Sequence, residues 1–436
     1  MPRPLTSSKT IIAFRQYKYY SGTRTPLSHR RMLHRLAHTV FLTMLVLLAG
    51  SCLRQKSSQT SAPVVESPPH VAGIPLTILE KADLRTLWYI SRLPMETGAQ
   101  VKQIFYHNST FYVLDNRNQL HALDANEGIL KWVQSIGAPL LNCSQREFYQ
   151  DLLVFVVGKS VVEIKQSDGT IVHTLNLKFT PTTTALRLDN TLFLGGDNRR
   201  FYALRRSDGI PMWQSVQPAD PVGPVASLQN YVYFTCADGT LYASETQQRK
   251  LVWQAPTAGK VTGVVLDEDQ CFLPSTDTAL YCFRAQTGDL MWKYYAGGPL
   301  FDLPTLTDRF AYQPVKQASL LCLDRRPARS QGALKWQLKN GSCLLAENGP
   351  ISYAMTLDNE ITLMDNNTGK RLISFYVPDL DLCVRNDQDA LIFLASRNGS
   401  ILALKPTRIY TTPKPPDAAA PAETAPAANN PAKTAP

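Results

Sequence analysis

The chain has 436 residues, of which 44% are hydrophobic and 18% are charged, and its formal net charge is +10 at pH 7. The excess charge is local, because residues 1–56 contain ten Lys and Arg and no Asp or Glu, which leaves 35 basic and 35 acidic residues in the remainder. Because the chain after residue 56 has no net charge, it lacks the excess of basic residues that binds phosphate. The composition therefore argues against a nucleic-acid-binding protein.

The basic head is followed by a short apolar run, Thr39–Gly50, and then by Cys52. This run is too short to cross a bilayer as a helix and suits a secretory signal. Leu48–Cys52 resembles the lipobox of bacterial lipoproteins, with Ala49 where Leu is usual. We therefore expect residues 1–51 to be a basic leader and signal peptide and Cys52 to carry a lipid. A cleaved signal with an incidental cysteine is the alternative.

Residues 1–31 are unusual for such a signal, since they are rich in Arg and Ser and contain no acidic residue. They fit either an organelle transit peptide or, as we favour, an extension upstream of a true start at Met32. Gln55–Ala72 is rich in Ser, Pro and Thr, so residues 52–75 are expected to be a flexible tether. Leu53, which follows the expected lipid attachment site, is consistent with sorting to the outer membrane.

A repeating unit of about 40 residues follows the tether. The gaps between successive tryptophans are 44, 81, 40, 39 and 44 residues, and the long gap holds two units. A period of this size, with strand-like segments between the markers, is typical of four-stranded propeller blades. The tryptophans are Trp88, Trp132, Trp213, Trp253, Trp292 and Trp336.

Most units also carry a small residue about ten positions before the tryptophan and a glycine between the two, as in Ala122, Gly128 and Trp132, although the fourth unit has Arg249 in place of the glycine. The glycine follows a turn, where left-handed geometry favours Gly or Asn. We expect the tryptophan to pack at the small position and to lie across the junction between blades, so that its deletion costs roughly 3–5 kcal/mol. The glycines expected to take part in this docking are Gly128, Gly209, Gly288, Gly332 and Gly369.

Eight such units are present, and within them strands alternate with Asp-Gly or Asn-Gly turns. The eighth unit, at Ala403, lacks a last strand, whereas Leu84–Arg92 contains Trp88 without the upstream markers. The sequence thus predicts an all-β, eight-bladed propeller of four-stranded antiparallel blades, closed by pairing of the N-terminal strand with the last blade. Its expected extent is residues 76–410, followed by a disordered Ala/Pro-rich tail at 411–436.

The pattern Ala-x-Asp-x-x-x-Gly-x-x-x-Trp at residues 122–132 resembles the tryptophan-docking repeat of the PQQ-like (quinoprotein-type) eight-bladed propellers. The resemblance covers roughly residues 84–407. That family includes dehydrogenases and non-enzymatic scaffolds. Within it, the signal, the cysteine at 52 and the eight units are most similar to the BamB-type lipoproteins of the outer-membrane β-barrel assembly machinery.

Motifs that would indicate catalysis are weak in this sequence. The resembling dehydrogenases stack PQQ on a disulfide between adjacent cysteines, and this chain has neither adjacent cysteines nor Cys-x-x-Cys-His for haem. Gly158–Ser160 ends like a phosphate loop but has Leu153 where a glycine is needed, which indicates a turn. Leu266–Gln270 suits a solvated acidic turn better than a Ca²⁺ site. His173, in the tryptophan position of the second unit, is expected to be a packed substitute.

Seven cysteines remain besides Cys52, and an odd number argues against a fully paired disulfide scaffold. Cys282 and Cys322 occupy the small position and are expected to be buried. Three others follow the tryptophan position and should lie on innermost strands lining a channel, where separate blades would keep most of them too far apart to bond. These three are Cys143, Cys343 and Cys383, while Cys236 and Cys271 fall on second strands.

We expect a non-enzymatic, lipid-anchored, monomeric propeller in the bacterial envelope, facing the periplasm, with no catalytic, cofactor-binding or metal-binding residues. The resemblance implies protein partners and, among them, the outer-membrane barrel-assembly complex. The alternative is a ligand-binding or sensory envelope propeller, for which polar and aromatic residues should converge at one mouth of the channel. A PQQ-dependent dehydrogenase is the third and least favoured hypothesis.

Overall fold

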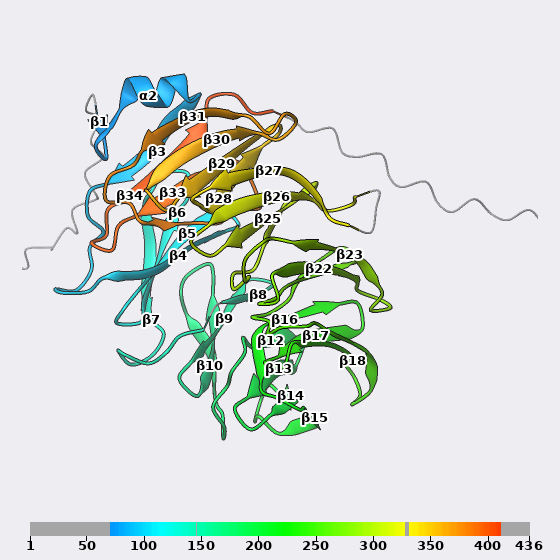
Figure 1. The fold of residues 1–436 in the computed structure, drawn as a ribbon. Helices are drawn as coiled ribbons and strands as arrows, with labels where there is room; N and C mark the ends of the chain where they lie inside the picture. The colour runs from blue at the N-terminus through cyan, green and yellow to red at the C-terminus, as the bar shows by residue number, and fades with distance from the viewer. Residues whose placement is uncertain (1–69, 145, 328–330, 411–436) are drawn as a thin grey trace, which may run out of the picture. The chain divides into compact units, whose positions relative to one another are not determined.

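The computed structural model describes residues 70–144, 146–327 and 331–410, all within the unit Ala62–Pro436. In these residues, eight four-stranded antiparallel sheets form a ring and only one short helix is present (Figure 1). The predicted all-β, eight-bladed propeller is therefore confirmed. The leader, the lipid attachment site at Cys52, most of the tether and the tail at 411–436 lie outside the described residues.

The strands of each blade are named in chain order from the innermost outward. Those of blades 1 to 4 are β4 (Val101–His107), β5 (Thr110–Asp115), β6 (Gln119–Asp124) and β7 (Leu130–Ser135); β8 (Glu147–Tyr149), β9 (Leu152–Val157), β10 (Ser160–Lys165) and β11 (Ile171–Asn176); β12 (Leu186–Leu188), β13 (Thr191–Gly196), β14 (Arg200–Arg205) and β15 (Pro211–Val216); β16 (Pro221–Leu228), β17 (Tyr231–Cys236), β18 (Thr240–Glu245) and β19 (Leu251–Pro256).

The remaining four blades follow the same order, except that the outer strand of blade 8 is β3, which comes first in the chain. Their strands are β20 (Val265–Asp267), β21 (Gln270–Pro274), β22 (Ala279–Arg284) and β23 (Leu290–Tyr295); β24 (Thr305–Leu306), β25 (Phe310–Val315), β26 (Ser319–Asp324) and β27 (Ala333–Lys339); β28 (Gly341–Asn348), β29 (Ile351–Thr356), β30 (Glu360–Asp365) and β31 (Arg371–Tyr376); and, in blade 8, β32 (Leu382–Cys383), β33 (Ile392–Ala395), β34 (Ile401–Pro406) and β3 (Leu84–Ile90).

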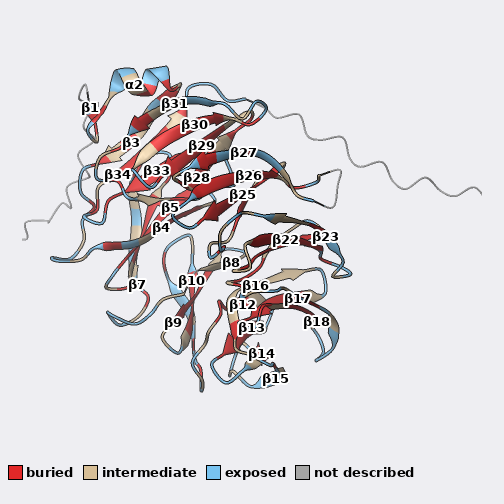
Figure 2. Ribbon diagram, viewed as in Figure 1, coloured by how far each residue is buried: buried red, intermediate tan, exposed pale blue. Residues whose placement is uncertain are grey.

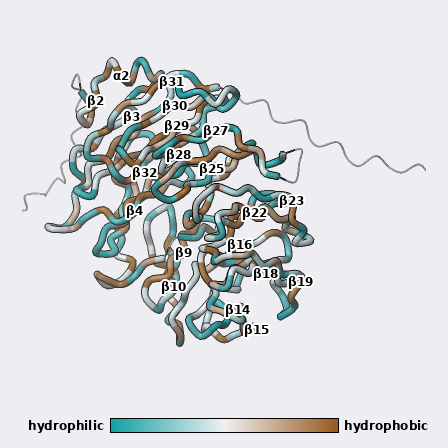
Figure 3. The backbone as a smooth tube through the Cα atoms, in the orientation of Figure 1, coloured by the Kyte–Doolittle hydropathy of each residue, from teal (hydrophilic) through white to brown (hydrophobic). Residues whose placement is uncertain are grey.

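The core lies on the middle strands, because neighbouring blades cover both faces of each sheet. All six residues of β5 are buried, whereas exposure alternates along the outer strand β7 of the same blade. A strand that is buried on both faces has a continuous run of apolar residues. A strand that is buried on one face alternates between apolar and polar residues. Figure 2 shows this gradient as red middle strands with tan and blue outer strands and turns, and Figure 3 shows brown, apolar segments along the same strands.

The ring closes as the sequence predicts. Strand β3 pairs antiparallel with β34 and becomes the outer strand of blade 8. Trp88 lies opposite Ala403 in this pairing, which is the register that the repeat requires. The N-terminal strand therefore removes the free sheet edge that the eighth unit would otherwise expose.

A hairpin and a helix that the sequence analysis did not anticipate precede β3: β1 (His70–Val71), β2 (Ile74–Pro75) and α2 (Leu76–Lys81). The helix ends where Asp83 adopts left-handed geometry, with φ of 54°. Val71, Ile74 and Leu79 pack into one buried cluster with residues of blades 7 and 8, so these elements cover the junction between those two blades.

Candidate functional site: the blade junctions and the central channel

In the blades that have a tryptophan, the small residue of the unit accommodates the ring of the same blade. Ala122 on β6 lies directly opposite Trp132 on β7, and Ala243 opposite Trp253, so a small side chain leaves room for the indole on the same sheet face. The indole then extends to the next blade. A Cβ at Gly169 of blade 2 would lie 2.6 Å from Trp132 Cε3, so only glycine permits this approach.

The expected docking glycines do not all meet a tryptophan. Gly128 lies under Trp88, and the other glycine–tryptophan pairs are Gly288 with Trp253, Gly332 with Trp292 and Gly369 with Trp336. Gly209 instead lies against Leu175, because blade 2 has no tryptophan at the docking position. Trp213 faces a unit in which Arg249 replaces the glycine.

A hydrogen bond to the next blade accompanies each docked ring. The indole Nε1–H of Trp88 donates to the Ala125 carbonyl oxygen at 2.8 Å, and that of Trp336 to the Asn366 side-chain oxygen at 2.9 Å. The sequence could not show this bond, since most acceptors are backbone oxygens that any residue supplies. The remaining tryptophan bonds run from Trp132 to Gln166, Trp213 to Thr246, Trp253 to Ala285 and Trp292 to Arg325.

Blade 2 replaces this contact with charged and polar groups. His173 Nε2 lies 2.8 Å from the Arg206 carbonyl oxygen of blade 3, in the place of an indole nitrogen. Glu163, opposite His173, is 0% exposed and forms ion pairs with Arg187 at 2.7 Å and Arg206 at 2.8 Å. The sequence analysis missed this Arg–Glu–Arg group, although a carboxylate at a small, buried position was a signal for it.

The junction between blades 7 and 8 has a different composition. Ile373 stands in the tryptophan position, opposite Leu363, and an alkyl side chain cannot donate the shared hydrogen bond. At the other seven junctions a tryptophan or histidine nitrogen lies within hydrogen-bond distance of an acceptor on the next blade. Packing of β1, β2 and α2 at this junction adds apolar contacts where the docking ring is absent.

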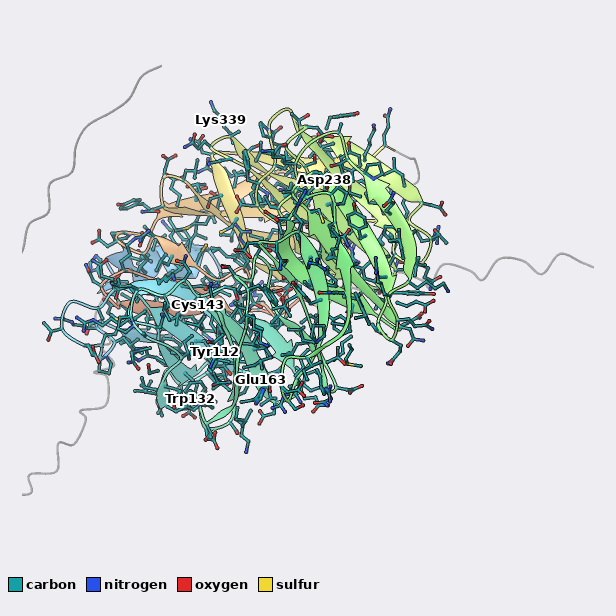
Figure 4. The ribbon with its side chains drawn as sticks, turned by 90° about the horizontal axis from the view of Figure 1, so that it is seen from below. Tyr112, Trp132, Cys143, Glu163, Asp238 and Lys339 are labelled. Carbon is teal, nitrogen blue, oxygen red and sulfur yellow. The ribbon has the colours of Figure 1, made fainter. Side chains whose placement is uncertain are left out.

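The first strands and the connections between blades line a central cavity of about 1710 Å³. Lining residues from both ends of the channel, such as Asn108 at an inner turn and Leu140 in a connection between blades, show that the cavity follows the channel. In Figure 4, Tyr112 lies between Cys143, which lines this cavity, and Trp132, whose ring centroid is 6.0 Å from that of Tyr112. The charged lining residues are of both signs: Lys102, Arg146, Lys159, Asp267, Asp302, Asp308, Arg385 and Asp387.

One wall of the cavity combines aromatic rings with a guanidinium group. Arg146 Cζ lies 4.7 Å from the Phe105 ring centroid, and His107 stacks on Phe148 with centroids 3.7 Å apart. Nε of Arg146 has no hydrogen-bond partner among the described residues. Burial, followed by the charge of Arg146, lowers the pKa of His107. This wall has the polar and aromatic character that the ligand-binding alternative requires.

Glu147, on the inner strand β8, gives a measurable pH dependence. Burial raises its pKa to about 7, against the hydrogen bond from Thr184 and the charge of Arg146, which lower it. Between pH 4.5 and 7 the folded protein therefore retains a proton that the unfolded chain releases, so this group makes stability fall as pH rises through that window.

We expect Glu147→Gln to raise the free energy of unfolding by about 1–2 kcal/mol at pH 8 and to leave it unchanged at pH 4. Urea denaturation at the two pH values measures this difference. Glu360→Gln, at a solvent-accessible ion pair, is the control and should show no such pH-dependent gain. Equal effects of Glu147→Gln at both pH values would contradict a raised pKa.

Two sequence motifs have structural roles in the described residues. Gly158 and Lys159 form the turn between β9 and β10. The acidic turn at 267–269 is solvent-accessible, as expected, and its side chains also form ion pairs: Asp267 contacts Arg325 at 2.6 Å, and Glu268 and Asp269 pair with Arg326. The described part of the chain brings together no group of three side chains able to hold a metal ion. It also contains no helix with the length and apolarity of a membrane span.

The cysteines divide into buried single thiols and one close pair. Cys236, Cys271, Cys282 and Cys322 are buried. Cys343 and Cys383, which sit on the inner strands of blades 7 and 8, have their Sγ atoms 2.8 Å apart. Most channel cysteines were expected to be too far apart to bond, and this pair is the exception.

The comparisons with known proteins agree with this architecture. The profile of the family described as "Outer membrane protein assembly factor BamB" matches residues 76–294. A search of curated protein sequences gives no match. Among solved structures, BamB from Moraxella catarrhalis has 14% identity and a TM-score of 0.56, with 74% of this chain and 99% of that chain covered.

Two further solved structures share the fold. The computationally designed Ika8 protein has 11% identity and a TM-score of 0.58, covering 70% of this chain and 96% of its own. The C-terminal WD40 domain of Sif2 has 8% identity and a TM-score of 0.57, covering 74% and 98%. At these identities the structural likeness establishes the propeller fold and nothing beyond it.

Proposed function

The chain belongs to the family of the outer membrane protein assembly factor BamB, and from this premise we propose that it is a non-enzymatic scaffold of the bacterial envelope. Its task is to hold protein partners, with the machinery that assembles outer-membrane β-barrels as the first candidate. A lipid on Cys52 would anchor the chain to the outer membrane, with the propeller in the periplasm. The lipobox-like Leu48–Cys52 and the Ser/Pro-rich tether support this arrangement.

The observation that carries the proposal is a set of exposed apolar side chains at one mouth of the channel. Leu140 is 92% exposed, Leu141 43% and Phe301 44%, and all three line the central cavity. They lie on connections from an outer strand to the next inner strand, which strand alternation places on the same face of the propeller. Large apolar groups held in water at a cavity rim are typical of protein-binding surfaces.

The backbone of Leu140 supports the same interpretation. Its φ is 70°, in the left-handed region that a bulky side chain rarely adopts. The fold therefore maintains an unfavourable conformation that directs a leucine into solvent, and strain of this kind concentrates at binding and switch sites. Lys159 and Arg385 line the same cavity and give the apolar residues charged neighbours, as in the polar rim of an interface.

We expect Leu140→Asp/Leu141→Asp to weaken association with the barrel-assembly complex by at least about tenfold, because a charge in an apolar contact leaves it desolvated and unpaired. Co-purification of the lipoprotein from detergent-solubilised native membranes, followed by quantification of the bound complex, measures this. Leu251→Glu is the control, since Leu251 is 51% exposed on the outer strand β19.

Retention of the complex by the double variant would overturn the proposed surface, and no association of the wild-type protein would overturn the proposed partner. Mass analysis of the mature N-terminus tests the lipid on Cys52 separately. Dye reduction after reconstitution with PQQ and Ca²⁺ would contradict the non-enzymatic role.

A ligand-binding envelope propeller is the second candidate function, favoured by Arg146 and the aromatic ring of Phe148, which line the cavity over the buried ring of Phe105. A guanidinium over aromatic faces suits an anionic or planar ligand. The two functions differ in what the channel does. A scaffold needs its rim, and therefore Leu140, whereas a ligand-binding propeller needs the interior wall and should tolerate changes at the rim.

A further inference from the structure

Cys343 and Cys383 form the closest pair of thiols that the structure describes. Their Sγ atoms are 2.8 Å apart, although 40 positions separate them in the sequence. This distance is shorter than the van der Waals contact of two sulfur atoms and longer than the 2.03–2.05 Å of a disulfide. Cys343 lies on β28 and Cys383 on β32, so a bond between them would join the inner strands of blades 7 and 8.

The location of the pair gives it a structural context. The junction between blades 7 and 8 has Ile373 where the others have a ring that donates to the next blade. The thiol pair joins the same two blades at their inner edge, and the apolar contacts of β1, β2 and α2 cover the same cluster, which includes Cys343. A covalent link here would join the blades that lack the shared docking contact and would secure the ring beside its closing strand.

The two sulfur atoms differ in access and in charge environment. Cys383 is half-buried and lines the cavity, whereas Cys343 is 4% exposed. The thiolate of Cys343 accepts the Cys383 S–H, which lowers the pKa of Cys343, and the guanidinium of Arg385 lowers it further. A positive group beside a thiol pair favours the thiolate, which is the species that reacts with disulfides.

We propose that Cys343 and Cys383 are a redox-active pair that closes into an inter-blade disulfide by exchange with a disulfide compound entering the channel. Cys383 passes its proton to the Cys343 thiolate as the Cys383 sulfur attacks one sulfur of the oxidant RSSR, which forms a mixed disulfide and releases RS⁻. Cys343 then gives that proton to RS⁻, and its thiolate attacks the Cys383 sulfur and releases the second RS⁻. The first RS⁻ takes the cysteine proton and the second takes a proton from solvent, so one RSSR is reduced to two RSH while one protein disulfide forms.

This inference does not depend on the proposed partner or on the lipid anchor. It requires only access of a disulfide compound to Cys383 through the cavity, and glutathione disulfide is a suitable probe. The closed loop constrains the unfolded chain, so the oxidised protein should also be the more stable form.

The experiment treats the purified full-length chain with glutathione disulfide, blocks free thiols under denaturing conditions and maps the cysteines by mass spectrometry. We expect a cross-linked peptide pair containing Cys343 and Cys383, lighter by two hydrogen atoms than the two separate peptides. We also expect the oxidised protein to melt a few degrees higher than the reduced protein. Cys343→Ser should trap a glutathione adduct on Cys383, because the second thiolate is missing.

Cys143→Ser is the matched control, since Cys143 also lines the cavity but lies on the connection into blade 2. This variant should form the same cross-link and show the same shift in melting temperature as the wild type. Recovery of Cys343 and Cys383 as free thiols after oxidation would overturn the proposal. A stable glutathione adduct on wild-type Cys383, without the cross-link, would overturn it as well.

Discussion

Replacing Trp88 with Ala is expected to lower the free energy of unfolding by about 3–5 kcal/mol, at the upper end of what one core side chain contributes. Trp88 is 2% exposed and its ring packs against both Phe111 of blade 1 and Phe393 of blade 8, with centroids 6.0 Å and 6.1 Å away. The substitution removes this packing and the indole hydrogen bond to Ala125 together. Urea denaturation at constant pH and temperature measures the loss.

Two further variants separate the contributions at this position. Trp88→Phe retains an aromatic ring but leaves the buried Ala125 carbonyl oxygen without its donor, so we expect a loss of about 1–3 kcal/mol. Met212→Ala, at an exposed position of the outer strand β15, should change stability by less than about 0.5 kcal/mol. If Trp88→Ala cost no more than Met212→Ala, the tryptophans would not be what holds neighbouring blades together.

The propeller ring was predictable because the same residue types recur at equivalent structural positions in successive blades. A small residue, a turn glycine and a tryptophan recur at similar spacing, and they mark the third strand, the following turn and the fourth strand of a unit. The closing strand was predictable for the same reason, since Trp88 has the last marker of a unit without the earlier ones, and Ala403 has an early marker without the last. The structure places those two residues opposite each other.

Contacts between units were not predictable in the same way. Five of the six indole hydrogen bonds end on backbone oxygens, which any residue supplies and which the side-chain pattern therefore cannot reveal. Cys343 and Cys383 lie on the inner strands of neighbouring units, as the sequence indicates, but the sequence does not show how closely those strands approach each other. Helix α2 is short, and its apolar residues are too few to give a helical period.

Replacing Glu163 with Ala is expected to cost about 3–5 kcal/mol, because removing one member of a buried ionic group leaves the others without compensation. The Glu163 carboxylate is inaccessible to solvent, while the side chains of Arg187 and Arg206 are only 14% and 23% exposed. Without the carboxylate of blade 2, the two guanidinium groups of blade 3 would lose their anionic partner at the junction between these blades. Urea denaturation of the full chain measures the change.

The matched control is Glu360→Ala, which breaks an exposed pair with Arg371 and should cost less than about 1 kcal/mol. Combining Glu163→Ala with His173→Trp recreates the small residue and tryptophan found in other units. Gly209 of blade 3 is available beneath the new ring, provided that Leu175 moves aside, so we expect the double variant to recover part of the lost stability. Equal losses for Glu163→Ala and Glu360→Ala would show that the carboxylate is not a substitute for the missing tryptophan. A larger loss of stability for Glu163→Ala, with recovery in the double variant, would mean that a buried ion-pair group and a docked tryptophan can replace each other at a blade junction.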